Sequence, residues 1–213
     1  MSDSKIVIVD YGSGNLESIQ QALGEIEGES EVTNDRLKIR KASRLILPGV
    51  GAFPSAMKKL MDRGLVETIQ EFAQTGKPLL GICLGMQLLM DSSKEFTLTK
   101  GLGLVQGDVT QLSDKQIVGE NRRIPNVGWY EVKNTKENLK GSVLEGLQEK
   151  DSFYFVHSFV CNPSIESDVF GKTSFGVSPF CSVVVKENIT GVQFHPEKSG
   201  KSGLRILENF ANL

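Results

Sequence analysis

The sequence is poor in the residues from which metal and disulfide sites are built. Its 213 residues include two histidines and three cysteines, and the cysteines form no Cys-x-x-Cys pair. An odd number of widely spaced cysteines argues against a disulfide framework, and the lack of clustered Cys and His argues against zinc. Cys161 and Cys181, in apolar contexts, are expected to be core residues. We therefore expect a reducing compartment, no metal and no cofactor.

The chain also lacks a charge excess and a long apolar run. Its formal net charge is −2, which leaves no electrostatic footprint for nucleic acid or a membrane surface. No apolar run approaches the ~18 residues that span a bilayer. Met1–Lys5 lacks the basic start and apolar core of a signal peptide. These absences predict a cytoplasmic protein.

The first half of the chain alternates short apolar runs with helical patterns. Strands are predicted at Lys5–Val9, Glu31–Thr33, Arg44–Leu47 and Pro78–Ile82, and helices at Asn15–Ile26, Ser55–Arg63 and Val66–Gln74. Such alternation predicts a parallel sheet with helices on both faces. Ligands of such sheets bind at the carboxyl ends of the strands, where we expect residues 48–51, Cys83 and His195 to lie.

From Gly101 onward the pattern changes to short strands and turns. Added mixed or antiparallel strands are predicted at Leu102–Val105, Asp108–Leu112, Val127–Lys133, Ser152–Val156, Ser182–Lys186 and Ile189–Gln193. A C-terminal amphipathic helix follows, with Leu204, Leu207, Phe210 and Ala211 on one face. Without repeats, low-complexity tracts or linkers, residues 1–213 are predicted to form a single domain.

The segment from Leu79 to Met90 has the layout of a nucleophile elbow. An apolar strand ends in Gly81-Ile82-Cys83-Leu84-Gly85 and passes into a helical pattern that extends to Met90. The flanking glycines suit a strained turn that packs closely on neighbouring strands. A thiol at this corner meets the helix N-terminus, whose dipole favours the thiolate. A buried structural cysteine beside a helix start is the alternative interpretation.

A histidine and a carboxylate more than a hundred residues later complete this chemistry. Val192–Glu197 is interpreted as a strand that ends in His195-Pro196-Glu197. Residues i and i+2 of a strand point to the same side, so Glu197 can fix the tautomer of His195 while the other ring nitrogen faces Cys83. Nucleophile, base and orienting carboxylate are the three parts that covalent acyl transfer requires.

Acyl transfer to Cys83 also requires donors for the oxyanion. The backbone N–H of Leu84, the residue after the nucleophile, is one predicted donor. A second is expected from the loop at Gly49-Val50-Gly51, through Val50 or Gly51, because glycines let a peptide plane turn its N–H inward or away. A plain strand-to-helix turn is the alternative for this loop.

With these parts assembled, the sequence resembles the glutaminase subunits of imidazole glycerol phosphate synthase, a branch of the Cys-His-Glu (class I) glutamine amidotransferases. The similar segments span the whole chain and comprise Asp10–Leu16, Pro48–Phe53, Gly81–Leu89, Tyr154–Ser158 and Gly191–Ser199. The resemblance implies a flavodoxin-like open sheet, mixed but mainly parallel, with helices on both faces and added antiparallel strands.

The resemblance also implies the reaction. Cys83 attacks the side-chain amide of glutamine, His195 shuttles protons and Glu197 orients it. The thioester is hydrolysed to glutamate, and ammonia is released. Glu95 would hold the α-amino group, while Gln87, Gly51 and the backbone of Ser158 and Phe159 would complete the pocket.

A partner is implied because free ammonia would protonate and escape in water. In this family the partner is a (βα)8-barrel cyclase, which forms a heterodimer with the glutaminase and makes imidazole glycerol phosphate in histidine biosynthesis. Asn15, Trp129, Tyr154 and Lys198 match interface positions of the family. A core position is the alternative for Trp129. Partner ligand is expected to switch the 49–51 loop to its active form.

Two departures from the family pattern leave the ammonia acceptor open. Tyr130 replaces the usual Asn after Trp129, and Cys161-Asn162-Pro163 replaces an acidic segment. A paralogous glutaminase that supplies ammonia for amidation of a surface-polysaccharide sugar is therefore an alternative. A partner-independent thiol hydrolase and a non-catalytic binding subunit are two more, although an intact Cys83, His195 and Glu197 argues against the latter.

Overall fold

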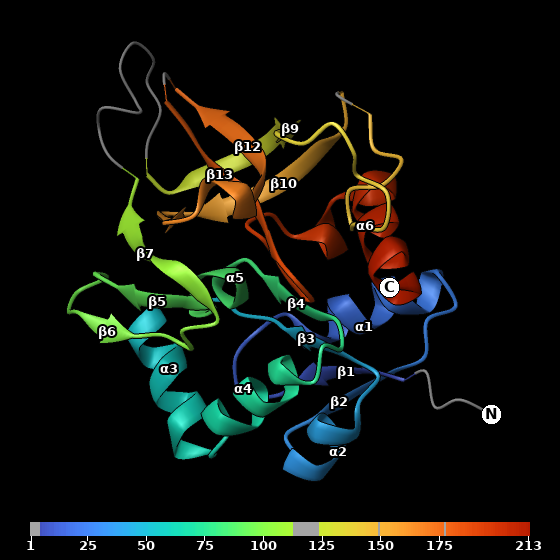
Figure 1. Cartoon of the computed structure of the whole chain (residues 1–213), viewed down its shortest axis with the longest axis vertical. Helices are drawn as coiled ribbons and strands as arrows, with labels where there is room; N and C mark the ends of the chain where they lie inside the picture. Colours follow the sequence, from blue (N-terminus) through green and yellow to red (C-terminus); the bar gives the residue numbers. More distant parts are fainter. Residues whose placement is uncertain (1–4, 113–123, 149, 177) are drawn as a thin grey trace.

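The core of the fold is a parallel sheet. The computed structural model describes residues 5–112, 124–148, 150–176 and 178–213. Five parallel strands lie in the order β2-β1-β3-β4-β14 (Figure 1). Their bounds are β1 Ile6–Val9, β2 Ser30–Thr33, β3 Arg44–Leu47, β4 Leu79–Ile82 and β14 Ile189–Val192. This order is the doubly wound, flavodoxin-like one, as expected.

Helices cover both faces of the parallel strands because successive strand residues point to opposite sides. On one face, Val7 and Val9 join a core cluster with residues of α2, α3 and α4. On the other, Ile6 and Ile8 join residues of α1 and α6 (Figure 1). The bounds are α1 Leu16–Glu25, α2 Arg36–Lys41, α3 Phe53–Asp62, α4 Val66–Gln74 and α6 Gly200–Asn212.

The late strand β14 lies directly beside β4, although more than a hundred residues separate them. Val192 is in register with Ile82, and the N–H of Cys83 donates to the carbonyl oxygen of Val192 over 2.8 Å. The residues that follow these two strands therefore emerge side by side at the carboxyl edge of the sheet. This pairing brings the His195 segment to Cys83.

The remaining strands extend the sheet beyond β14 in the order β13-β11-β7-β5-β6, with β12 and β9 branching from β13. Their bounds are β5 Met90–Ser93, β6 Thr99–Lys100, β7 Val105–Gln111, β9 Lys133–Asn134, β11 Phe159–Pro163, β12 Val169–Phe175 and β13 Ser178–Lys186. All their pairings are antiparallel except that of β5 with β7. The predicted mixed extension is confirmed. Cys161 and Cys181 face each other across β11 and β13 as buried core residues.

A separate antiparallel pair, β8 (Asn126–Glu131) and β10 (Ser152–His157), stands against this extended sheet. One side of the pair packs into the core through Phe153 and Phe155. The other side carries Val127, Trp129 and Val156, which are all exposed. The pair thus has one buried and one open face, as is common for antiparallel strands.

Several predicted elements differ from the structure. The helix after the elbow, α5 (Leu84–Leu88), stops before Met90, which begins β5, because the chain must leave the crowded corner to pair with β7. Leu102–Leu104 is not a strand; β7 begins at Val105. The strand β14 ends at Val192 rather than Gln193, and α2, β5, β6, β11 and β12 were not predicted. Helix α2 does have a sequence signal, since the Asp35 side chain caps it by accepting from Leu37 and Lys38 N–H.

Candidate active site

Cys83 occupies a strained corner between β4 and α5. Its backbone has φ +53° and ψ −111°, a region that non-glycine residues rarely adopt. A side chain on Gly85 would place Cβ 1.9 Å from the carbonyl oxygen of Leu47, and one on Gly81 would come within 2.8 Å of backbone atoms of α5. Glycine is therefore required on both sides of the turn. The predicted elbow is present, and Cys83 is 6% exposed.

His195 and Glu197 form a buried pair. Nδ1 of His195 lies 2.8 Å from Oε1 of Glu197, and the two side chains are 4% and 0% exposed. The contact does not arise on a strand, as the sequence pattern suggested. The residues after His195 form the 3₁₀ turn η3 (Pro196–Lys198), which folds the carboxylate back onto the ring. The hydroxyl of Ser199 holds this turn by donating to the carbonyl oxygen of His195.

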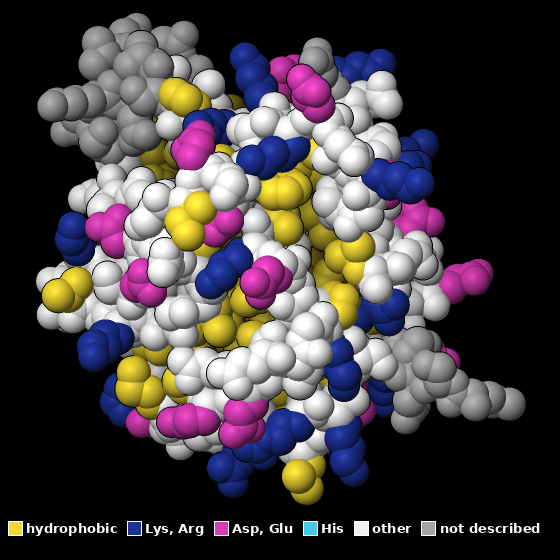
Figure 2. All heavy atoms as spheres, in the orientation of Figure 1, with side chains coloured by type: hydrophobic (Ala, Val, Ile, Leu, Met, Phe, Trp, Pro, Cys, Tyr) yellow, Lys and Arg dark blue, Asp and Glu magenta, His cyan; other side chains and the backbone are white. Residues whose placement is uncertain are grey.

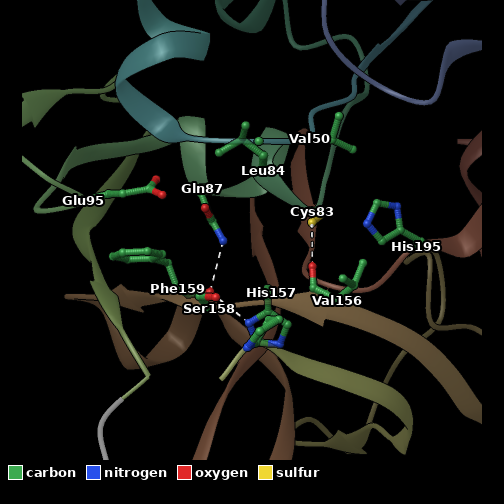
Figure 3. Close-up of a pocket in the computed structure, with 12 residues that line it drawn as sticks. Val50, Cys83, Leu84, Gln87, Glu95, Val156, His157, Ser158, Phe159 and His195 are labelled. Carbon is green, nitrogen blue, oxygen red and sulfur yellow. Dashed lines mark hydrogen bonds between the residues drawn. The ribbon is translucent and has the colours of Figure 1, made fainter. Parts of the chain in front are cut away.

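The second ring nitrogen of His195, Nε2, is buried and has no hydrogen-bond partner among the residues that the structure describes. Figure 3 shows the ring beside Cys83. Burial by itself lowers the pKa of His195, but the interactions with Cys83 and Glu197 outweigh it and raise this pKa to about 10. Cys83 and Glu197 together thus favour the charged imidazolium form of His195, in which Nε2 holds a proton that faces the sulfur.

A cavity of about 360 Å³ opens in front of Cys83 (Figure 3). Nine of the ten predicted catalytic, oxyanion and substrate residues line it: Val50, Gly51, Cys83, Leu84, Gln87, Glu95, Ser158, Phe159 and His195. The tenth, Glu197, stands behind His195. The tertiary structure therefore brings this whole predicted set together.

Glu95 forms one wall of the cavity although it is only 8% exposed. Its Oε2 accepts a 2.7 Å hydrogen bond from the backbone N–H of Phe53, the first residue of α3. This bond holds the carboxylate in the wall of the cavity. A carboxylate in that position suits a cationic group of a ligand.

Gln87 lies on α5, one turn beyond Cys83, and is 5% exposed. Its Nε2 donates to the carbonyl oxygen of Phe159 over 3.1 Å and to Oε1 of Gln193 over 3.2 Å. Because both amide protons have partners, only Oε1 of Gln87 is left to contact a ligand.

The loop at Pro48–Gly51 is held by residues of the glycine-rich loop after β1. The hydroxyl of Ser13 donates to the carbonyl oxygen of Val50 over 2.8 Å, and that of Tyr11 donates to Pro48 over 2.9 Å. Burial raises the pKa of Tyr11 far above its ordinary value, so this hydroxyl stays a donor. Gly51 has φ +94°, which favours glycine.

The four residues predicted at a partner interface occupy different surroundings. Trp129 is 56% exposed and packs edge-on against Tyr154 across β8 and β10, with ring centroids 6.0 Å apart. The alternative of a core tryptophan is therefore wrong. Lys198 is exposed on η3, and Asn15 is half-buried at the start of α1. Val156 links the cavity to the open face of the β8–β10 pair.

Residues near the nucleophile that had no predicted role include His157 and Gln193. His157 lines the cavity, and burial lowers its pKa to about 4. Gln193 is fully buried and donates from Nε2 to Sγ of Cys83 over 3.7 Å. Gln193 lies two residues before His195, in the segment Gly191–Ser199 quoted for the family resemblance, but it was given no role. His157 lies in a segment already quoted for the family resemblance, but its strand context gave it no role.

Within the described ranges, no group of three or more His, Cys, Asp or Glu side chains is arranged to hold a metal ion. The helices of those ranges include none long and apolar enough to cross a membrane. No histidine side chain is visible on the face drawn in Figure 2, where apolar side chains show near the middle, between and beside charged ones.

Comparison with known proteins agrees with this geometry. The family model "Glutamine amidotransferase class-I" matches residues 7–213. The imidazole glycerol phosphate synthase subunit HisH of Sulfurimonas denitrificans is 47% identical over 205 residues, which cover 96% of each chain. That of Wolinella succinogenes is 44% identical over 206 residues, which cover 97% of this chain and 98% of the relative.

A solved structure has the same fold at low sequence similarity. PurLQS from Thermotoga maritima matches with a TM-score of 0.71 at 19% identity, covering 98% of this chain and 97% of that one. Matches over nearly the whole length, together with the elbow and the buried His195–Glu197 pair, leave one conclusion. The chain belongs to the class I glutamine amidotransferase family.

Proposed function

We propose that this chain is the glutaminase subunit of an imidazole glycerol phosphate synthase, acting in histidine biosynthesis in the cytoplasm. The observation that carries the chemistry is the buried Nε2 of His195 beside Cys83, which no described residue pairs with, while Nδ1 is held by Glu197. The HisH relatives, similar over nearly the full length of the chain, support the pathway.

The reaction starts with glutamine in the cavity. Its α-amino group pairs with Glu95, and its carboxamide lies against Cys83. The thiolate attacks the carboxamide carbon, and the backbone N–H groups of Leu84 and of Val50 or Gly51 stabilise the oxyanion. The imidazolium of His195 then protonates the leaving nitrogen, so the C–N bond breaks, ammonia departs and a thioester remains.

The second half of the reaction hydrolyses the thioester. Neutral His195 takes a proton from water, whose oxygen attacks the thioester carbonyl. The C–S bond breaks, glutamate is released, and the Cys83 thiolate and the His195 imidazolium are restored. Glu197 orients the ring throughout and stabilises its charged form.

The ammonia needs a protected exit, and the open face of the β8–β10 pair offers a docking surface beside the cavity. Val127 pairs with Val156, and Trp129 with Tyr154, so apolar side chains extend from the cavity wall over this face. Exposed aromatic residues are typical anchors of protein interfaces. A (βα)8-barrel cyclase, as expected from the family resemblance, is the proposed partner, with Lys198 and Asn15 at the rim.

The two departures that favoured a sugar-amidating paralogue lie away from this face. The Tyr130 ring packs edge-on against Phe155 and Phe175 on the core side of β8. Cys161 is 1% exposed, and the Asn162 side chain donates to Asp108 and Thr110. Neither departure therefore changes the proposed interface, and the histidine pathway is the preferred assignment.

The test measures glutamate release and product formation. The chain is assayed alone and with the cyclase subunit from the same source plus its ribonucleotide substrate, with Cys83→Ala as the control. We expect faint activity alone, a strong increase in the complex, and transfer of ¹⁵N from amide-labelled glutamine into the imidazole product. Activity that ignores the cyclase would move the assignment to another acceptor, and no turnover in any mixture would overturn the glutaminase proposal.

A further inference from the structure

The environment of the Cys83 sulfur includes a group that the triad does not account for. Gln193 is fully buried, and its Nε2 lies 3.7 Å from Sγ in donor geometry. The register of β14 with β4 places it there, because their last residues, Val192 and Ile82, pair, and the residues that follow the two strands are Gln193 and Cys83. The side chain is thus positioned by the sheet itself.

We propose that Gln193 is a positioning residue that stabilises the Cys83 thiolate by donating an amide N–H to the sulfur. A thiol proton that donates to the Val156 carbonyl oxygen, 3.9 Å away, is lost when the thiolate forms. The N–H of Gln193 remains as a donor to the charged sulfur, and hydrogen bonds to a charged group are the stronger ones. This inference rests on the proposed function only for its catalytic consequence.

The orientation of the Gln193 amide follows from its neighbours. The carbonyl oxygen of Phe159 can only accept, so the end of the Gln87 amide that approaches it must be the NH₂ group. The same NH₂ contacts the Gln193 amide, whose near end must therefore be the oxygen. The other end, facing Cys83, is then the NH₂ group. The donor toward the sulfur is thus determined by a backbone carbonyl on β11.

His157 fixes the position of that backbone carbonyl. Its Nδ1 lies 2.9 Å from the Phe159 oxygen and must donate to it, while Nε2 accepts from Asn126 Nδ2 over 3.0 Å. The Phe159 carbonyl oxygen thus accepts two hydrogen bonds, one from Gln87 and one from His157, and these use both of its lone pairs. A continuous set of hydrogen bonds therefore runs from Asn126 on β8 through His157, Phe159 and Gln87 to Gln193.

The set includes residues of both strands that carry the proposed docking face, since Asn126 begins β8 and His157 ends β10, with their own side chains on the buried side of the pair. Displacement of these strands would shift the position of the Phe159 carbonyl oxygen. Through Gln87, this shift would change the orientation of the Gln193 amide that faces the sulfur. This set of hydrogen bonds reaches Cys83 through Gln193 and not through His195. Its effect on the sulfur is thus separable from that of the triad.

The experiment measures how the reactivity of Cys83 depends on pH in the full-length chain. Iodoacetamide modification is followed by peptide mass spectrometry for the native protein, Gln193→Met and Gln193→Glu. Methionine keeps the length but removes the donor, and glutamate replaces the donor by a negative charge. We expect the midpoint pH of modification to be lowest in the native protein, higher in Gln193→Met and highest in Gln193→Glu. At a fixed pH below the midpoint, each pH unit of rise should lower the reaction rate about tenfold.

Steady-state kinetics in the cyclase complex provide the second measurement. We expect kcat to fall in the same order while KM for glutamine changes little, since Gln193 contacts the sulfur and Gln87. Gln70→Glu is the matched control: Gln70 donates to the Leu102 carbonyl oxygen outside the cavity, and its substitution should leave midpoint and kcat unchanged. Equal midpoints in all three proteins, with activity falling only in parallel with Tm, would overturn the proposal.

A further variant covers the case in which neither substitution of the buried Gln193 folds. Gln87→Met leaves Gln193 in place but removes the donor that orients its amide, so the midpoint should rise here too. An unchanged midpoint in this variant contradicts the orientation argument. A native chain without glutaminase activity would overturn the proposed function instead, while the midpoints would still test the role of Gln193.

Discussion

The hydroxyl of Ser13 donates a hydrogen bond to the carbonyl oxygen of Val50, over 2.8 Å. The carbonyl and the N–H of one peptide group point in opposite directions, so this bond also sets the direction of the Gly51 N–H, a candidate oxyanion donor. The 49–51 loop is expected to switch between a resting and an active form, and we predict that the Ser13 bond stabilises the resting orientation.

Ser13→Ala should accordingly raise the glutaminase rate of the isolated chain. Loss of one hydrogen bond of about 1 kcal/mol corresponds to roughly a fivefold change in the population of the alternative loop orientation. Glutamate release without the cyclase measures this rate, and Ser13→Thr, which keeps the hydroxyl, is the control. A lower rate for Ser13→Ala would mean that the hydroxyl holds the active orientation.

The backbone strain at Cys83 lowers the stability of the fold, and a glycine at this position should restore stability while activity is lost. A residue with Cβ at φ +53° and ψ −111° costs about 1–3 kcal/mol, which glycine avoids. Cys83→Gly should therefore be more stable than Cys83→Ala by about 1 kcal/mol, after the roughly 0.5–1 kcal/mol entropic cost of glycine. Both should be inactive.

Chemical denaturation of the two Cys83 variants checks this difference. Ala22→Gly, inside α1, gives the opposite sign as a control, since glycine destabilises a helix interior. If Cys83→Gly is the less stable of the two Cys83 variants, the corner is not strained in solution.

Glu95→Gln separates substrate recognition from the structural bond to Phe53. The glutamine Oε1 can still accept from the Phe53 N–H, but the negative charge facing the cavity is lost. We expect KM for glutamine to rise by about 10-fold or more, because a hydrogen bond to a charged group contributes about 1.5–3 kcal/mol, with kcat and Tm nearly unchanged. Glu145→Gln, on an exposed residue outside the cavity, is the control. An unaltered KM would remove Glu95 from the proposed amino-group site.

Trp129→Ala should weaken association with the cyclase without destabilising the fold. The side chain is 56% exposed, so its removal leaves the core intact, whereas an interface tryptophan of this kind contributes about 2 kcal/mol, or roughly a 30-fold change in Kd. Calorimetric titration with the cyclase subunit measures the change. Met61→Ala is a matched control, because Met61 is 54% exposed at the far end of α3. Equal Kd values for both variants would exclude Trp129 from the interface.

His157 should make the fold sensitive to acid. Burial lowers its pKa from 6.5 to about 4, so the unfolded chain binds more protons than the folded one in that interval. The free energy of unfolding therefore falls as pH decreases from 6.5 to 4, by up to about 3 kcal/mol from this residue. His157→Gln should flatten that part of the stability curve, measured by denaturation at each pH.

His195→Gln offers the contrasting control for this acid effect. The pKa of His195 is raised, so its contribution to stability is present below pH 6.5 and is lost only as pH rises toward 10. His195→Gln alone would leave the buried Glu197 carboxylate without its cation, so Glu197→Gln is combined with it. The slope between pH 6.5 and 4 should then stay as it is in the native protein. Equal slopes for His157→Gln and the native chain would show that His157 is not held neutral by burial.

The sequence by itself determined the elements whose causes are local. The alternation of apolar runs and helical patterns predicted β3 and α4 to the residue, and glycines around Cys83 predicted the elbow, because a tight turn against neighbouring strands excludes any side chain there. The proximity of His195 to Glu197 was also predicted, although a 3₁₀ turn rather than a strand produces it.

Only the tertiary structure decided what surrounds the nucleophile. The contacts of Gln87 with the Phe159 carbonyl and of Gln193 with Cys83 join residues 72 and 110 positions apart, and no local pattern encodes them. They arise because β14 inserts beside β4 and β11 lies two strands further along the same sheet. Likewise the exposure of Trp129 and the packing of the half-buried Tyr130 against the core depend on which face of β8 turns inward, and strand alternation alone allows either.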